Sequence, residues 1–159
     1  MISIREVCPK MSDAIDAMIK GLREILGDNF KVDMESFGHA NRGVCYGCAA
    51  TCAIQQIAGK LFTPDDLEYA YMVAKKATAL DMNKEEMLAF ETAIDQFRMG
   101  NIWFLLKFYG IRAESSGINI LLPNGSKVMM GSWYMNTRDY KAQLLFIEEW
   151  NNQLKQAGY

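Results

Sequence analysis

Apolar residues recur at helical spacing in the first part of the chain, at steps of three and four residues. This spacing places them on one face of an α-helix. Ser12 before them is a favourable N-cap, and Gly27 after them is a typical helix end. The pattern predicts a helix between these two residues, with a buried face made of Ile15, Met18, Ile19, Leu22 and Ile25.

The spacing of apolar residues changes from helical to alternating in the next segment, and the segment after that has no regular spacing. Residues 30–35 alternate apolar and polar side chains, which is typical of a half-buried strand. Residues 36–47 contain three glycines and are predicted to form a flexible loop. The loop leads into a predicted helix over residues 48–58, which Gly59 closes.

Two further helices are predicted from their capping residues. Thr63-Pro64-Asp65-Asp66 combines a capping hydroxyl, a first-turn proline and two carboxylates, and so starts a helix that runs to about residue 80. Asn83 with Glu86 three residues later resembles a capping box and starts a second helix, which ends near Arg98 and Gly100. These two helices are expected to pair antiparallel.

The C-terminal third contains a short core helix, a hairpin and a long amphipathic helix. Residues 102–108 are apolar on nearly every side, which indicates either a central core helix or a buried strand, and a helix that Gly110 ends is the favoured prediction. Residues 118–122 and 127–131 read as two strands joined by an Asn124-Gly125 turn. From residue 137 a final helix is expected, with one stripe formed by Tyr140, Leu144, Ile147, Trp150 or Asn151, and Leu154.

The order of these elements predicts the fold class. We expect a predominantly helical α+β fold with about six helices and a small antiparallel sheet, made from the strand near 30–35 and the hairpin near 117–131. Regular alternation of strand and helix is missing, which disfavours a doubly wound sheet. The length of 159 residues and the lack of a polar linker predict a single globular domain over residues 1–159.

Composition and charge exclude several classes of partner. The net charge is −2 without a basic run, so nucleic acid is not an expected partner. The longest apolar stretch is far shorter than the roughly 20 residues of a membrane-spanning helix, and no secretory signal is visible. We therefore expect a cytoplasmic protein without membrane contact, in which Cys8, Cys45, Cys48 and Cys52 stay reduced.

Reactive residue types concentrate between His39 and Cys52. If the helix began at Cys45, its turns of 3.6 residues would place Cys45, Cys48 and Cys52 on one face. Free cysteine is among the most buried residue types, so this stripe is explained by core packing. The neighbouring alanines would then allow another helix to approach closely.

A second interpretation is nucleophilic catalysis by Cys48. Residues Gly43, Cys45, Cys48 and Ala50 match the Q-G-x-C-G-S-C-W-A stretch of the papain-like cysteine peptidases, which this segment resembles over about nine residues. The resemblance implies that Cys48 is a nucleophile at the start of a helix. Arg42 stands where that family has its oxyanion-stabilising Gln, Ala49 replaces the Trp, and no histidine follows. His39, the only histidine, would have to act as the base.

Two more interpretations use the same cysteines. Cys45-Tyr46-Gly47-Cys48 is a C-x-x-C pair at the start of a helix, as in thioredoxin-like oxidoreductases. Cys45, Cys48 and Cys52 with Cys8 or His39 would be a metal or iron–sulfur ligand set, but only one C-x-x-C pair exists. We therefore expect no metal and no cofactor.

The function expected first is that of a non-enzymatic intracellular binding or regulatory protein. It would contact a protein or a small-molecule ligand through the loop at 36–47 and the segment at 131–136. The candidate binding residues are Asn41, Arg42, Tyr46, Trp133 and Tyr134. The alternative is a cysteine-dependent enzyme, either a papain-like thiol hydrolase or a thiol-disulfide oxidoreductase, that uses Cys48 with Cys45 or His39.

Overall fold

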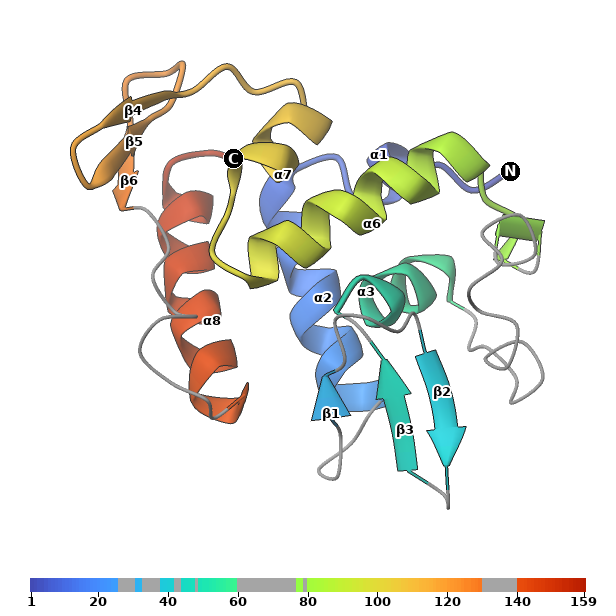
Figure 1. Cartoon of the computed structure of the whole chain (residues 1–159). Coiled ribbons are helices and arrows are strands. Elements are labelled where there is room, and N and C mark those ends of the chain that lie inside the picture. Colours follow the sequence, from blue (N-terminus) through green and yellow to red (C-terminus); the bar gives the residue numbers. More distant parts are fainter. Residues whose placement is uncertain are drawn as a thin grey trace.

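The computed structural model describes residues 1–25, 31–32, 38–41, 44–47, 49–59, 77–78, 80–129 and 140–159; the side chains of residues 25, 31–47, 140 and 141 lie outside this description. Within these ranges it confirms a predominantly helical α+β fold (Figure 1). The helices are α1 (Ile4–Val7), α2 (Met11–Ile25), α3 (Ala49–Ala58), α6 (Lys84–Arg98), α7 (Trp103–Phe108) and α8 (Tyr140–Gln156). The strands are β1 (Lys31–Val32), β2 (Gly38–Asn41), β3 (Val44–Gly47), β4 (Glu114–Ser116), β5 (Asn119–Leu121) and β6 (Lys127–Met129).

The strands form two sheets, which lie at opposite ends of the group of helices in Figure 1. In the first sheet, with order β1-β3-β2, β3 pairs parallel with β1 and antiparallel with β2. In the second, with order β4-β5-β6, both pairings are antiparallel. The predicted strand near 30–35 therefore joins a different sheet from the predicted hairpin, because its partner is β3.

The prediction of a loop over residues 36–47 is wrong at the residues of this range that the structure describes. Residues 38–41 and 44–47 pair as two antiparallel strands, with Gly38 opposite Gly47 and Asn41 opposite Val44. The glycines suggested backbone freedom, but pairing with a neighbouring strand satisfies the backbone N–H and C=O groups that a loop would leave to water.

The predicted hairpin near 117–131 is confirmed by β5 and β6. Gly125 has φ +87°, a backbone conformation that favours glycine, and its N–H donates to the Leu122 carbonyl at 2.9 Å. Ser126 N–H donates to the Asn124 side-chain oxygen at 2.9 Å. The third strand of this sheet, β4, carries three exposed polar residues and has no alternation that could reveal it.

The first long helix begins earlier than predicted. α2 starts at Met11, and the Lys10 N–H donates to the Asp13 carboxylate at 3.0 Å. Ser12 lies inside the helix and is buried, and its N–H donates to the main-chain oxygen of Tyr159 at 3.1 Å. The earlier start places Met11 in the core, where it is 1% exposed.

Helices α6, α7 and α8 follow the prediction. Asn83 caps α6 by accepting the Glu86 N–H at 2.9 Å. The segment after Ile102 is helical and ends before Gly110, which has φ +64°. The stripe of α8 is buried at Leu144, Ile147, Trp150, Asn151 and Leu154. The helix predicted over residues 63–80 falls almost entirely outside the described residues.

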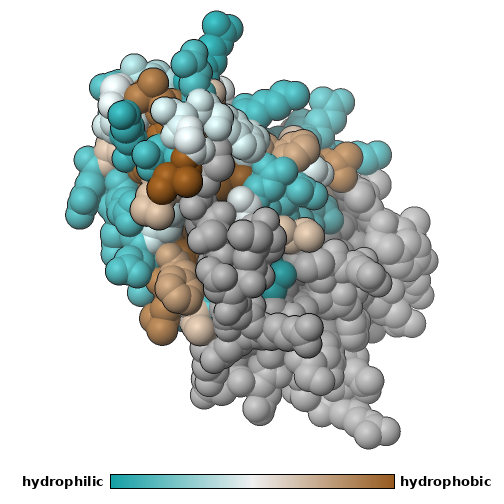
Figure 2. All heavy atoms as spheres, turned by 60° about the vertical axis from the view of Figure 1, so that its left-hand side comes forward, coloured by the Kyte–Doolittle hydropathy of each residue, from teal (hydrophilic) through white to brown (hydrophobic). Residues whose placement is uncertain are grey.

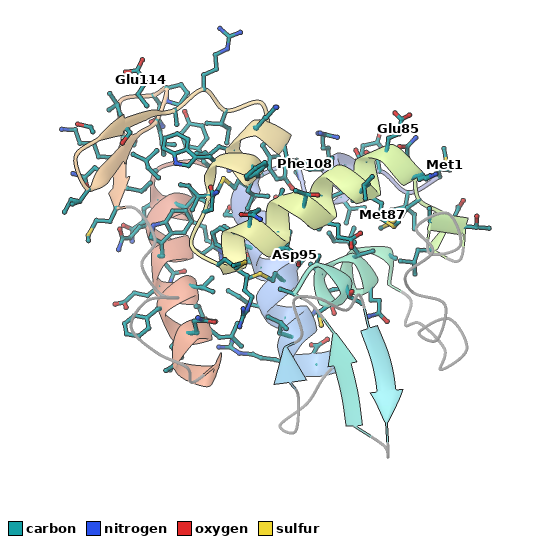
Figure 3. All side chains as sticks on the ribbon, viewed as in Figure 1. Met1, Glu85, Met87, Asp95, Phe108 and Glu114 are labelled. Carbon is teal, nitrogen blue, oxygen red and sulfur yellow. The ribbon has the colours of Figure 1, made fainter. Side chains whose placement is uncertain are left out.

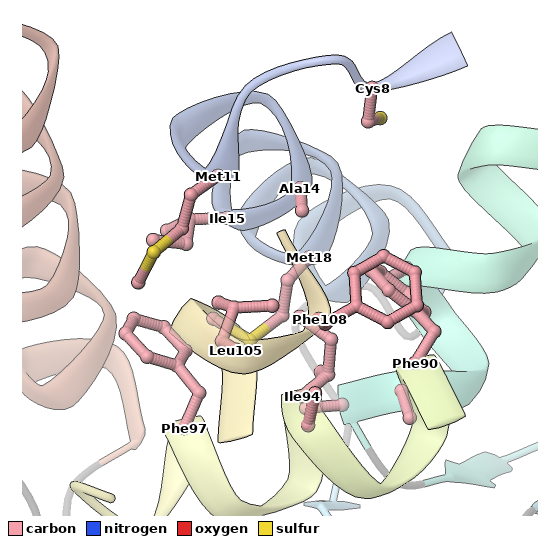
Figure 4. Close-up of a cluster of buried hydrophobic side chains, with 14 of the residues drawn as sticks. Cys8, Met11, Ala14, Ile15, Met18, Phe90, Ile94, Phe97, Leu105 and Phe108 are labelled. Carbon is pink, nitrogen blue, oxygen red and sulfur yellow. The ribbon is translucent and has the colours of Figure 1, made fainter. Parts of the chain in front are cut away.

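The core lies where α2, α3, α6, α7 and α8 meet (Figure 4). Phe90 and Phe97 of α6 are both fully buried. The Phe90 ring meets the Phe108 ring edge-on at 5.4 Å, a favourable arrangement of two aromatic rings. The alanines at 49, 50 and 53 are fully buried, and their small size lets α3 pack closely on α2.

Candidate functional site

The cysteines of the candidate catalytic segment belong to different elements. Cys45 lies in strand β3, and Cys52 is fully buried in α3. The predicted stripe of three thiols on one helix is therefore wrong, because a helix beginning at Ala49 cannot include Cys45. Cys48 lies outside the described residues, between the end of β3 and the start of α3.

The described backbone places His39 in a definite register with the segment that precedes Cys48. His39 of β2 pairs with Tyr46 of β3, and Ala40 pairs with Cys45. Cys48 follows Tyr46 by two residues. The side chains of His39, Cys45 and Tyr46 lie outside the description, so no described contact joins them to Cys48.

Of the predicted binding residues, Asn41 and Tyr46 lie on the paired strands β2 and β3. Asn41 ends β2 and pairs with Val44, and its side chain is outside the description. Arg42, Trp133 and Tyr134 lie wholly outside the described residues. As to metals, the described residues hold no group of three or more histidine, cysteine or acidic side chains that could bind an ion.

The two described thiols, Cys8 and Cys52, are both buried. Cys52 is 0% exposed, in agreement with its interpretation as a core residue. Cys8 is 5% exposed, and burial, reinforced by the charges of Asp13 and Asp16, raises the pKa of its thiol to about 11. A thiol with so high a pKa is protonated at neutral pH and is a poor nucleophile.

A polar network joins α1 to the start of α6. The Glu86 carboxylate accepts the Ile4 N–H at 2.5 Å and the Ser3 hydroxyl at 3.4 Å. It also forms an ion pair with the Arg5 guanidinium at 2.8 Å. The carboxylate thus satisfies a free N–H group at the beginning of α1, as a capping residue does within one helix.

Arg5 is held from three sides. Its Nε donates to the Phe108 carbonyl at 3.0 Å and its Nη1 donates to Glu86. Its guanidinium carbon lies 3.8 Å from the centre of the Phe108 ring, which is a cation–π contact. These contacts fix the guanidinium, although 48% of the Arg5 side chain is exposed.

An open pocket of about 590 Å³ lies beside this network. Figure 3 shows Met1 and Glu85 close together at the N-terminal end of α6, where the pocket lies. It is lined by Met1, Ile2, Ser3, Arg5, Asn83, Glu85, Glu86 and Ala89. It therefore combines one fixed guanidinium, two carboxylates, a hydroxyl and an amide with a small apolar wall.

Sequence reasoning missed this pocket. The Asn83 and Glu86 spacing predicted a capping box, and the Asn83 half of the box is present. The Glu86 half is directed to another helix, 82 residues away along the chain. The only signal in the sequence was a glutamate three residues after a helix N-cap. No residue near Glu86 in the sequence indicated that Ile4 and Arg5 are its partners.

Exposed apolar side chains are scattered over the described surface. Figure 2 shows apolar residues on one face in small groups that are separated by hydrophilic ones. The apolar residues exposed on α8 are Leu145 and Phe146. Every helix in the described ranges is too short or too polar to cross a bilayer.

Comparisons with protein-family models, with curated proteins and with solved structures gave no match to this chain.

Proposed function

We propose that this protein is a non-enzymatic cytoplasmic binding protein that takes a small polar ligand in the pocket between α1 and α6. The observation that supports this proposal is the pocket itself, whose volume of about 590 Å³ falls in the range of roughly 300–1,000 Å³ typical of small-molecule sites. Its polar groups come from two helices that Glu86 holds together.

The Arg5 guanidinium is the proposed anchor for an anionic group. Two of its nitrogens donate to Phe108 and Glu86, and Nη2 donates no hydrogen bond to any described residue. Nη2 carries two N–H groups, which suit a carboxylate. Because the guanidinium is already held in place, a ligand would not have to immobilise it.

The Glu85 carboxylate is the proposed partner for a cationic group. It is exposed at the pocket rim, next to Glu86, whose charge is compensated by Arg5. Ile2 and Ala89 add apolar wall. The ligand class that fits these groups is a small zwitterion, such as a free amino acid, with its carboxylate on Arg5 and its ammonium on Glu85.

Calorimetric titration with the standard free amino acids tests this function. We expect saturable binding by at least one of them, and weaker binding by the Glu85→Gln variant, which removes one charge without changing the shape of the side chain. Glu114→Gln, which removes an exposed carboxylate from β4, is the matched control and should bind like the wild type. If none of the amino acids saturates the protein below about 10 mM, which corresponds to a binding free energy of about −2.7 kcal/mol, the result would count against the pocket.

A cysteine-dependent enzyme is the second candidate, supported by the register of the first sheet. Pairing of His39 with Tyr46 brings the only histidine of the chain onto the strand next to the one that leads to Cys48. The ten-residue helix α3 begins immediately after Cys48, and the positive end of its dipole would favour a thiolate there. Neither Arg5 nor the pocket takes part in this candidate.

Iodoacetamide labelling across pH, followed by peptide mapping, separates the two candidates. An activated Cys48 would react quickly near neutral pH, and His39→Ala would raise the pKa of its thiol toward the ordinary value for cysteine. A Cys48 that reacts slowly, with a pKa that His39→Ala leaves unchanged, would exclude the enzyme.

Surface contacts with a protein partner are also proposed for the β2–β3 hairpin and for residues 131–136. Asn41, Arg42, Tyr46, Trp133 and Tyr134 remain the residues that sequence reasoning favours for this role. Combined alanine variants in each segment, used in a pull-down with a cell lysate, would show whether either segment retains a partner.

A further inference from the structure

The turn of the C-terminal hairpin is attached to the end of α8 through one asparagine. The Asn124 side-chain Nδ2 donates to the Ala157 carbonyl at 2.7 Å, and the Asn124 main-chain N–H donates to the Tyr159 hydroxyl at 3.1 Å. The side-chain oxygen of Asn124 accepts the Ser126 N–H at 2.9 Å. Every polar group of this side chain therefore has a partner within the turn or the helix end.

Asn124 is also the only asparagine in the chain that precedes a glycine. In such a pair the glycine N can attack the asparagine side-chain carbonyl, because no glycine side chain hinders its approach. A bond forms between the glycine nitrogen and the side-chain carbonyl carbon, and the side-chain nitrogen leaves as ammonia. The product is a five-membered succinimide. Water then opens the ring to aspartate or isoaspartate. Asparagine is among the thermolabile residues for this reason.

Native hydrogen bonds engage both the nitrogen that would attack and the nitrogen that would leave. The Gly125 N–H, whose nitrogen would attack, donates to the Leu122 carbonyl at 2.9 Å. The Asn124 Nδ2, which would leave, donates to Ala157. We propose that Asn124 is a deamidation site that the docked end of α8 protects, so that release of this end starts an irreversible chemical change.

The product would not restore the native contact. A carboxylate at residue 124 has no N–H group and would place negative charge against the Ala157 carbonyl. This carbonyl lies at the C-terminal end of α8, where the helix dipole is already negative. Docking of the helix end on the turn is therefore weakened once the change has occurred, and isoaspartate also lengthens the backbone of the turn.

The test compares deamidation rates at Asn124 in the full chain, measured by peptide mapping with mass spectrometry. The rate should be lower in buffer than in urea. Tyr159→Phe removes the hydroxyl that accepts the Asn124 N–H and should raise the rate in buffer about threefold to tenfold, the effect of losing one hydrogen bond. Tyr109→Phe, which removes the hydroxyl hydrogen bond to the Cys8 carbonyl and no contact of Asn124, is the control and should not change the rate.

Equal rates in buffer and in urea would overturn the proposal, as would a Tyr159→Phe rate equal to that of the wild type or of Tyr109→Phe. A second measurement does not depend on the slow reaction. In Asn124→Asp, amide hydrogen exchange at residues 157–159 should be faster than in the wild type. Unchanged exchange at these residues would show that the helix end docks without the asparagine.

Discussion

Gly21 of α2 lies directly against the main-chain carbonyl of Cys52 in α3. A Cβ built on Gly21 would overlap the Cys52 carbonyl oxygen and lie 2.7 Å from its carbon. Backbone atoms cannot move aside as a flexible side chain can, so α2 and α3 approach this closely only because residue 21 has no side chain. The two helices form the most extensive helix pair in the described core.

Gly21→Ala should therefore destabilise the protein by about 1–3 kcal/mol, the usual cost of overpacking a core. An alanine in place of a helical glycine normally stabilises a protein by about 0.5–1 kcal/mol, so a decrease in the unfolding free energy would indicate the close contact of the two helices. Urea denaturation monitored by circular dichroism measures the difference. Lys20→Ala, at the exposed neighbouring position, should stay within about 0.5 kcal/mol of the wild type. A stabilised Gly21→Ala variant would contradict the close packing.

Glu86→Gln should cost about 1–3 kcal/mol, because the variant removes the charge that pairs with Arg5 and weakens the bond to the Ile4 N–H. Glu85→Gln is the matched control, since the neighbouring carboxylate is exposed, and its unfolding free energy should change by less than about 0.5 kcal/mol. Equal effects of the two variants would show that the network between α1 and α6 contributes no stability.

The free energy of unfolding should fall as pH rises from about 9 toward 11. The Cys8 thiol has an ordinary pKa of 9.0 and a folded-state pKa of about 11, so between these values the unfolded chain loses a proton that the folded chain keeps. The contribution of this thiol to the unfolding free energy is fully present below pH 9. At higher pH the unfolding free energy falls by at most about 3 kcal/mol through this group. Cys8→Ala should flatten this part of the pH profile, measured by urea denaturation at each pH.

Among the described residues, Cys8→Ala leaves Tyr109 as the other group with a raised pKa. Burial and the neighbouring Cys8 and Asp13 raise the pKa of this phenol above its usual value. Because the phenol of the unfolded chain titrates at its ordinary pKa of 10.0, Tyr109→Phe should reduce the pH dependence of the unfolding free energy above about pH 10, whereas Cys8→Ala reduces it from about pH 9. An unchanged profile between pH 9 and 11 in Cys8→Ala would assign the effect to another group.

Cys8 and Cys52 should resist iodoacetamide in the native protein, since both thiols are buried. Labelling should become fast only in denaturant, and peptide mapping identifies each thiol separately. Fast labelling of Cys52 in buffer would mean that α3 opens away from α2, which the contact of Gly21 with Cys52 argues against.

Local patterns along the chain were enough to predict much of the fold. The apolar spacing of α2 and α8, the Asn83 cap of α6 and the Asn124-Gly125 turn all depend on residues close in sequence. Helical periodicity and turn chemistry act over a few residues, so they can be read without knowing what lies opposite. The strands β2 and β3 and the exposed strand β4 escaped prediction, because strand pairing depends on a partner that the strand itself does not specify.

The candidate pocket was decided by tertiary packing. Glu86 carries the same local signal as any glutamate three residues after a cap, and its partners Ile4 and Arg5 lie 82 and 81 residues away. In the same way, no residue near Gly21 in the sequence indicates that the Cys52 carbonyl of α3 lies against it. Short-range periodicity thus sets where elements begin and which face is apolar. Which faces meet, and which polar groups come together at the contact, depends on closing long loops in three dimensions.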